Sequence, residues 1–308
     1  MSATFTVTGE RRYRDIILKT DTLVFERNSK LVLAPTEKNP NAPRTLTIIA
    51  KTIDIQGNAE ITYDLDGRTG LDPDTPAPPT TTIAPSGSNG SSPSGEGSYP
   101  HAADGGPGRP GRSGARGIDG MDAPVLEIFA DKVTSSDMRI NFKGQDGGRG
   151  GRGGDGGKGG DGQKGAASKA SSAWYDGEEC EREPGRGGNG GAGGDAGYPG
   201  RGGKGGNGGI VKVFVSHDSL ALAQAWNIVV SGGKGGDAGD PGNPGAGGRG
   251  GAQGDKHGPC PERSEYRGRD GPPGRSMSVI DPDWRRNFKG DDGRDGYYSV
   301  DELRGMPR

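Results

Sequence analysis

Apolar and polar residues alternate in four regions of the chain, and a period of two predicts half-buried β-strands. The apolar positions are Leu23, Phe25, Leu31 and Leu33; Leu46, Ile48, Ile53, Ile55, Ile61 and Tyr63; Leu126, Ile128, Val133, Ile140 and Phe142; and Val211, Val213, Val215, Leu220, Leu222, Ile228 and Val230. Leu46–Ala50 resembles Leu126–Ala130, and Asn141–Gly144 recurs as Asn287–Gly290. Such short units cannot bury an apolar face alone, so we expect them to stack as repeated rungs.

Between these regions, glycine occupies every third position. The unbroken runs are Gly105 to Gly120, Gly144 to Gly165, Gly185 to Gly209 and Gly233 to Gly254, with shorter echoes at 268–274 and 290–296. A period of three is that of the polyproline-II backbone. In some runs a second position is also glycine, as from Gly148 to Gly160, which leaves two bare edges for neighbouring helices. This pattern favours a bundle of polyglycine-II helices over collagen, which leaves its other two positions to proline-rich side chains.

Together these patterns predict a mostly β chain with irregular structure and little or no α-helix. We expect β-solenoid-like stacked strand rungs, from which polyglycine-II hairpins project as a bundle. Residues 1–66 form the predicted β-rich base or attachment region. Residues 67–308 form the glycine-rich bundle, with strand inserts at 124–142, 210–230 and 277–289. The third edge of each arm, which carries residues such as Arg149, Asp155 and Lys158, is expected to face water.

Composition narrows the function classes. Only 28% of the 308 residues are hydrophobic, which is too few for the hydrophobic core of a conventional globular protein of this length. The formal net charge of −2 provides no basic field for nucleic acid or an anionic membrane, and aspartates interleave the Arg-Gly-Gly repeats. No apolar stretch is long enough to span a membrane, and Met1 to Tyr13 lacks a secretory signal. No catalytic constellation stands out, so we expect neither an enzyme nor a cofactor.

The predicted topology brings loops 166–184 and 255–267 together at the tip opposite the strands. Cys180 lies in the first loop and Cys260 in the second. A disulfide that ties the two loops is the leading hypothesis, because closing a long loop stabilises a fold by about 2–4 kcal/mol. Two unpaired thiols are one alternative. A metal site is the other, because His257 lies three residues before Cys260 and His101 could approach them.

The same two loops carry the candidate ligand-binding residues. These are Trp174, Tyr175, Glu178 and Glu179 in the first loop, and His257, Arg263 and Tyr266 in the second. Aromatic and charged side chains on loops that a rigid scaffold holds are common recognition surfaces. The alternative is structural, with Trp174 and Tyr266 capping the end of the bundle.

The Gly-Gly-X runs interrupted by variable loops resemble two kinds of polyglycine-II protein, over roughly residues 105–296. The chain is most similar to T-even-like phage tail-fibre tip adhesins; its arms also resemble those of the snow flea antifreeze protein. The first resemblance implies a non-enzymatic adhesin that binds a cell-surface receptor or glycan, possible docking of the N-terminal region on a fibre protein, and a virion or cell-surface location. A homo-oligomer is also possible. The alternatives are a structural matrix or fibre protein and, second, an ice-binding protein.

Overall fold

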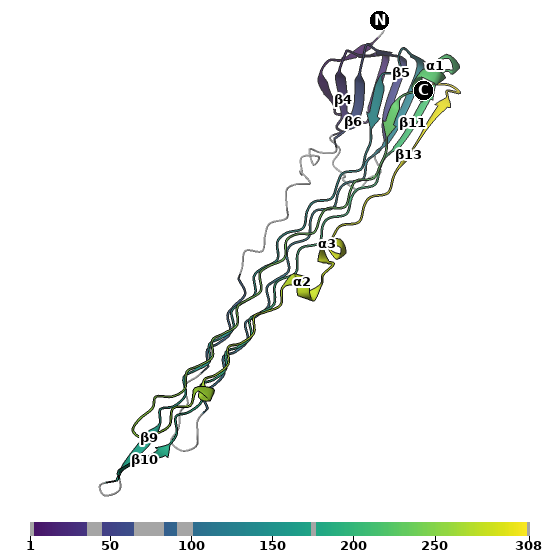
Figure 1. The fold of residues 1–308 in the computed structure, drawn as a ribbon. Helices are drawn as coiled ribbons and strands as arrows, with labels where there is room; N and C mark the ends of the chain where they lie inside the picture. The colour runs from purple at the N-terminus through teal and green to yellow at the C-terminus, as the bar shows by residue number, and fades with distance from the viewer. Residues whose placement is uncertain (1–2, 36–44, 65–82, 91–100, 174–176, 307–308) are drawn as a thin grey trace.

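The computed structural model describes residues 3–35, 45–64, 83–90, 101–173 and 177–306. Figure 1 shows a β-rich base, which holds both chain ends, and a long bundle of glycine-rich segments that leads to a small tip. The chain is mostly β with few helices, and its main strands form two parallel sheets. This coarse architecture confirms the expectation from the sequence.

Successive strands alternate between the two sheets of the base. The six-stranded sheet contains, in spatial order, β1 (Thr4–Val7), β3 (Ile17–Phe25), β5 (Thr45–Ile55), β7 (Val125–Val133), β11 (Ile210–Val215) and β13 (Tyr297–Glu302). The five-stranded sheet contains β12 (Asn227–Val229), β8 (Met138–Asn141), β6 (Ala59–Tyr63), β4 (Ser29–Leu33) and β2 (Glu10–Tyr13). Each strand pairs in parallel with its neighbours, so equivalent residues of consecutive units lie side by side.

The two sheets enclose one apolar core. Leu18, Ile48, Ile128 and Val213 face each other in register across four strands of the larger sheet and are all buried. Leu31, Ile61 and Ile140 form the corresponding row in the smaller sheet. The repeat between Leu46–Ala50 and Leu126–Ala130 is a direct strand pairing, since Leu46 lies beside Leu126 and Ala50 beside Ala130. Burial of the alternating residues therefore holds the base together.

Among the described residues, five long glycine-rich segments, here called arms, lie between the base and the tip, and residues 83–90 pair beside arms 1 and 2. They are arm 1 (101–124), arm 2 (143–168), arm 3 (183–209), arm 4 (231–256) and arm 5 (267–275 continued by 288–296). Arms 2 and 4 leave the smaller sheet, whereas arms 1, 3 and 5 lead into the larger sheet (Figure 1). The inbound and outbound arms thus extend the two layers of the base.

Backbone hydrogen bonds join the arms at every triplet. In arm 2, Gly150 donates its N–H to the carbonyl of Asp237 in arm 4, while Gly151 donates to Ala115 in arm 1. Gly200 of arm 3 donates to Gly151 in turn. These bonds are 2.7–3.0 Å long and recur at intervals of three residues. An interior arm therefore donates twice per triplet, which explains why two of its three residues are glycine.

At the edge of the bundle, aspartate carboxylates and proline residues take the place of further hydrogen bonds between backbones. Arm 4 has no outbound arm beyond it, and Gly232, Gly235 and Gly250 donate instead to the carboxylates of Asp295, Asp292 and Asp270 on arm 5. At the same phase of the triplet, arm 4 carries Pro241 and Pro244, which have no N–H to donate. These aspartates and prolines leave arm 4 few free backbone N–H groups with which another chain could pair, as charged residues and prolines do on an edge strand.

The third edge of the arms does more than face water, which corrects the expectation. Asp155 accepts a hydrogen bond from the backbone N–H of Asn243 on arm 4, at 2.8 Å, and Asp161 does the same for Arg249. Asn189 and Asn207 play this part for Arg269 and Arg294 of arm 5. These short side chains supply the third backbone donor of a triplet with a partner, so the edge also ties neighbouring arms together.

Two of the three expected strand inserts require correction. Region 277–289 contains the helices α2 (Met277–Ile280) and α3 (Trp284–Asn287), and no strand. Here Met277 and Trp284 pack against Ala238 of arm 4, while Asp281 accepts hydrogen bonds from Asn287. Arg275 and Phe288 of arm 5 pair with Ala196 and Gly202 of arm 3. Arm 3 covers this distance in six residue steps, whereas arm 5 uses thirteen. The surplus chain folds into two short helices on the side of the bundle (Figure 1).

Region 210–230 begins and ends as strands, but the helix α1 (His217–Gln224) lies between them. Leu220 and Leu222 therefore belong to a helix and not to an alternating strand. Ser219 and Ala223, four residues apart, form its buried face. Ser219 accepts a hydrogen bond from the backbone N–H of Val133, which anchors α1 against β7. The insert at 124–142, in contrast, forms β7 and β8 as expected.

Candidate functional site at the tip

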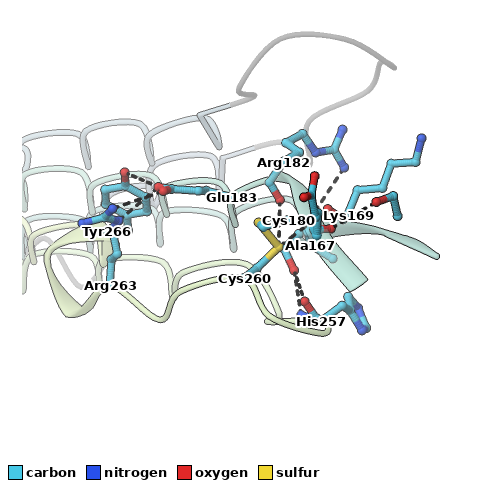
Figure 2. The surroundings of a disulfide bond; sticks show 12 residues. Ala167, Lys169, Cys180, Arg182, Glu183, His257, Cys260, Arg263 and Tyr266 are labelled. Atoms are coloured by element: carbon cyan, nitrogen blue, oxygen red, sulfur yellow. Dashed lines mark hydrogen bonds and ion pairs between the residues drawn. A yellow bond between two sulfur atoms is a disulfide. The ribbon is translucent and has the colours of Figure 1, made fainter. Parts of the chain in front are cut away.

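The tip is built from the antiparallel hairpin of β9 (Lys169–Ala173) and β10 (Gly177–Arg182), against which residues 257–266 fold. Cys180 and Cys260 form a disulfide with a Cα–Cα distance of 4.8 Å. Cys260 is completely buried between the carbonyls of Lys169 and Arg182, as Figure 2 shows. The structure therefore contains the leading pairing from the sequence, and the two loops meet at the tip.

The disulfide takes both sulfurs away from a metal site. Across the part of the chain that the structure describes, no group of three or more His, Cys, Asp or Glu side chains is placed to hold a metal ion. His257 instead uses its backbone N–H to donate to Ser168 at 2.6 Å, which fixes the turn beside the disulfide. With this pairing, neither Cys180 nor Cys260 is a free thiolate ligand for the metal site considered from the sequence.

Glu183, Arg263 and Tyr266 form a second clasp next to the disulfide (Figure 2). Arg263 donates to both carboxylate oxygens of Glu183, at 3.0 and 3.1 Å, and the Tyr266 hydroxyl donates to one of them at 3.0 Å. Arg186 lies over the Tyr266 ring, 4.7 Å from its centroid. These contacts place Arg263 and Tyr266 in the packing of the tip, which favours the capping interpretation for Tyr266.

The remaining candidates divide into two groups. Glu178 and Glu179 lie on β10 and are exposed, opposite Ser172 and Ser171 in the hairpin. Glu178 also approaches the turn at Gly258, so the acidic hairpin lies against the second loop. Trp174 and Tyr175 lie outside the described residues. The structure thus places five of the seven candidates at the tip: Glu178, Glu179, His257, Arg263 and Tyr266.

A groove of about 600 Å³ on the flank of the tip was not expected from the sequence. Arms 1, 3 and 5 border it, and its lining includes His101, Asp104, Arg186, Tyr266, Arg267 and Arg269. Tyr266 and Arg267 belong to loop 255–267, which the sequence predicts to lie at the tip, whereas nothing in the sequence places Arg186 or Arg269 beside them. Their convergence depends on the pairing of arms far apart in sequence.

The chain was compared with protein-family models, curated proteins and solved structures. None of them matches it. No helix in the described ranges is long and apolar enough to cross a membrane.

Acid is expected to loosen the clasp formed by Glu183, Arg263 and Tyr266. The hydrogen bonds from Arg263 and then from Tyr266 lower the pKa of Glu183 below its ordinary value of 4.5. A carboxylate with a depressed folded-state pKa stabilises the fold above its unfolded-state pKa, and this contribution is lost as pH falls through the folded-state value. NMR signals of the Arg263 guanidinium and Tyr266 ring should therefore stay constant down to the ordinary glutamate pKa and change only as pH falls below it.

The matched variant is Glu183→Gln, which keeps an oxygen acceptor and removes the titrating charge. It should abolish the acid transition of both signals. Persistence of the same transition in Glu183→Gln would assign it to another carboxylate.

Proposed function

We propose that this chain is a non-enzymatic adhesin or receptor-binding tip protein. In this proposal, the two parallel sheets form a β-solenoid base, the arms are polyglycine-II helices that act as a rigid spacer, and the tip binds a cell-surface receptor or glycan. The observation that carries the proposal is the position of the covalent link. The Cys180–Cys260 disulfide joins the loops farthest from the base, where a stable surface serves recognition.

The repeating arm network supports the spacer role. Each interior triplet is held by backbone hydrogen bonds to two neighbours, so the arms resist bending apart along their length. The disulfide is also consistent with an extracellular, virion or cell-surface location, because disulfides persist in oxidising surroundings. The base is then the natural place for attachment to a fibre protein or to further copies of the chain.

A structural matrix or fibre protein is the second candidate, since the glycine repeats resemble those of assembling proteins. Such a protein needs a side that accepts further chains. The edge of arm 4 works against lateral addition, because Asp270, Asp292 and Asp295 already accept its hydrogen bonds and Pro241 and Pro244 lack donors. An ice-binding role is disfavoured by the charged third edge of the arms, since ice requires a flat and weakly polar face.

The adhesin proposal is tested by removing the acidic charges of the exposed hairpin. The variant Glu178→Gln with Glu179→Gln alters side chains without a buried role, so the fold should persist. If the hairpin contacts the receptor, adhesion of the purified chain to cells should fall several-fold, as measured by binding of fluorescently labelled protein. The matched control is Glu10→Gln with Glu26→Gln in the base, which should leave adhesion unchanged.

Unchanged adhesion of the hairpin variant would remove the hairpin from the receptor site. If neither the parent chain nor the variants adhere to cells, and the chain self-associates in ultracentrifugation, the result would favour a matrix protein.

A further inference from the structure

The groove on the flank of the tip holds two arginine side chains that the fold does not use, while its three arginines are matched by three acidic residues. Arg267 and Arg269 line it and are exposed, and neither guanidinium has a hydrogen-bond or ion-pair partner among the residues that the structure describes. Arg186 adds a third guanidinium, which the Tyr266 ring holds in place. A folded protein gains little from two unpaired neighbouring arginines, because their charges repel each other.

The acidic residues of the groove are largely committed elsewhere. Asp104 accepts a hydrogen bond from the backbone N–H of Asn189 at 2.6 Å, and Asp270 accepts one from Gly250 at 2.8 Å. Glu265 lies 3.7 Å from Arg263. Asp104 and Asp270 thus tie neighbouring arms together, while Glu265 faces Arg263 within its own loop. The arginines remain as the groups available to a ligand.

The backbone keeps two of these arginines in a fixed relation to the groove. Asn189 accepts the N–H of Arg269, at 2.9 Å, while Gly187 donates its N–H to the carbonyl of Tyr266, immediately before Arg267. Arg267 and Arg269 both line the groove, so a ligand that fills it and carries several negative charges can meet both guanidinium groups.

We propose that this groove binds an acidic saccharide, through carboxylate or sulfate groups paired with Arg267 and Arg269. Guanidinium groups match planar carboxylates and sulfate oxygens with two parallel hydrogen bonds, which favours arginine over lysine for such ligands. The open, polar lining suits a hydrated sugar better than an apolar ligand. This inference rests on the proposed adhesin function and names the ligand class of its tip.

The direct test measures binding of defined oligosaccharides to the full chain by calorimetry. Oligogalacturonate supplies carboxylates, dextran sulfate oligomers supply sulfates, and methyl-esterified oligogalacturonate and plain dextran are their uncharged counterparts. We expect at least one acidic probe to bind, both neutral probes to fail, and affinity to fall with added salt. Arg267→Ala with Arg269→Ala should weaken that binding by about tenfold or more.

The control variant is Arg294→Ala. Like Arg269, Arg294 lies on arm 5 and donates its backbone N–H to an asparagine of arm 3, but it lies outside the groove. Both Arg269→Ala and Arg294→Ala keep this backbone bond, so a general loss of fold along arm 5 would affect them alike. Arg294→Ala should bind the acidic probe as the parent does.

Equal weakening by Arg294→Ala, or no binding of either acidic sugar, would overturn the proposal. So would equally tight, Arg267- and Arg269-dependent binding of an oligoglutamate peptide, since the groove would then be a general anion site. Cell adhesion separates this inference from the proposed function. A chain that adheres through its tip but ignores acidic sugars would refute only the ligand class.

Discussion

Replacing Gly203 by alanine is expected to destabilise the bundle by about 3 kcal/mol or more. Gly203 lies in interior arm 3, where it donates to Gly148 and accepts from Gly236, each at 2.8 Å. A Cβ atom at this position would collide with the backbone at Ile118 and Asp119. Backbone cannot move aside as a flexible side chain can, so arm 1 would separate from arm 3 and hydrogen bonds would break. Thermal unfolding followed by circular dichroism measures the loss.

Lys204→Ala is the matched control because it changes the adjacent residue on the third edge. Its backbone N–H, which donates to Asp119, is retained. We expect a change within about 0.5 kcal/mol. Alanine also restricts the unfolded chain relative to glycine, which stabilises by about 0.4–1 kcal/mol and opposes the predicted effect at Gly203. Equal melting temperatures for the two variants would show that arms 1 and 3 do not touch at Gly203.

Removing the disulfide is expected to open the tip while leaving the base intact. The bond closes a loop with a sequence separation of 80. Chain entropy for such a loop corresponds to about 4 kcal/mol. In the double variant Cys180→Ser with Cys260→Ser, hydrogen exchange in 169–182 and 255–267 should accelerate strongly. Because each element of this chain contacts mainly its neighbours, exchange in β5 and β7 should change little.

Reductant provides an internal control for this experiment. It should accelerate tip exchange in the parent chain and have no effect on the double variant, which has no cysteines left. Protection of the tip that is equal with and without the disulfide would assign its order to Glu183, Arg263 and Tyr266 alone.

Features with a regular period were predictable from the sequence. Leu46 and Leu126 were matched as repeats, and their strands pair in the structure because a parallel stack places equivalent residues side by side. The glycine period located both tip loops correctly, and with them Cys180 and Cys260. A regular period reflects contacts that repeat along the chain, so it can be recognised in the sequence before the three-dimensional contacts are known.

Features that depend on which arm lies where were not predictable. Triplets with two glycines predict two neighbouring helices, but the sequence does not show that arms 2 and 3 are the interior ones. Ile118 replaces the second glycine in arm 1, where fewer neighbours exist. The resemblance of Asn287–Gly290 to Asn141–Gly144 was misleading in the same way. Phe142 is buried in the base, whereas Phe288 packs beside a helix of the bundle.

The candidate site shows the same division. Arg263 and Tyr266 were identified by residue type, but their engagement with Glu183 became visible only in the structure. Arg269 resembles any other third-edge arginine in the sequence, and Arg267 any charged residue at the end of a loop. Their place in a groove follows from the contact of arm 5 with arm 3.

The triplet-by-triplet pairing of the arms also limits how this molecule can change its length. One extra triplet in a single interior arm would leave its donors facing the wrong carbonyls from that point onward. The seven surplus residue steps of arm 5, which form α2 and α3, are tolerated at an edge where one side is free. A longer or shorter relative must therefore gain or lose a triplet in every arm together, so reach evolves in increments of about 9 Å.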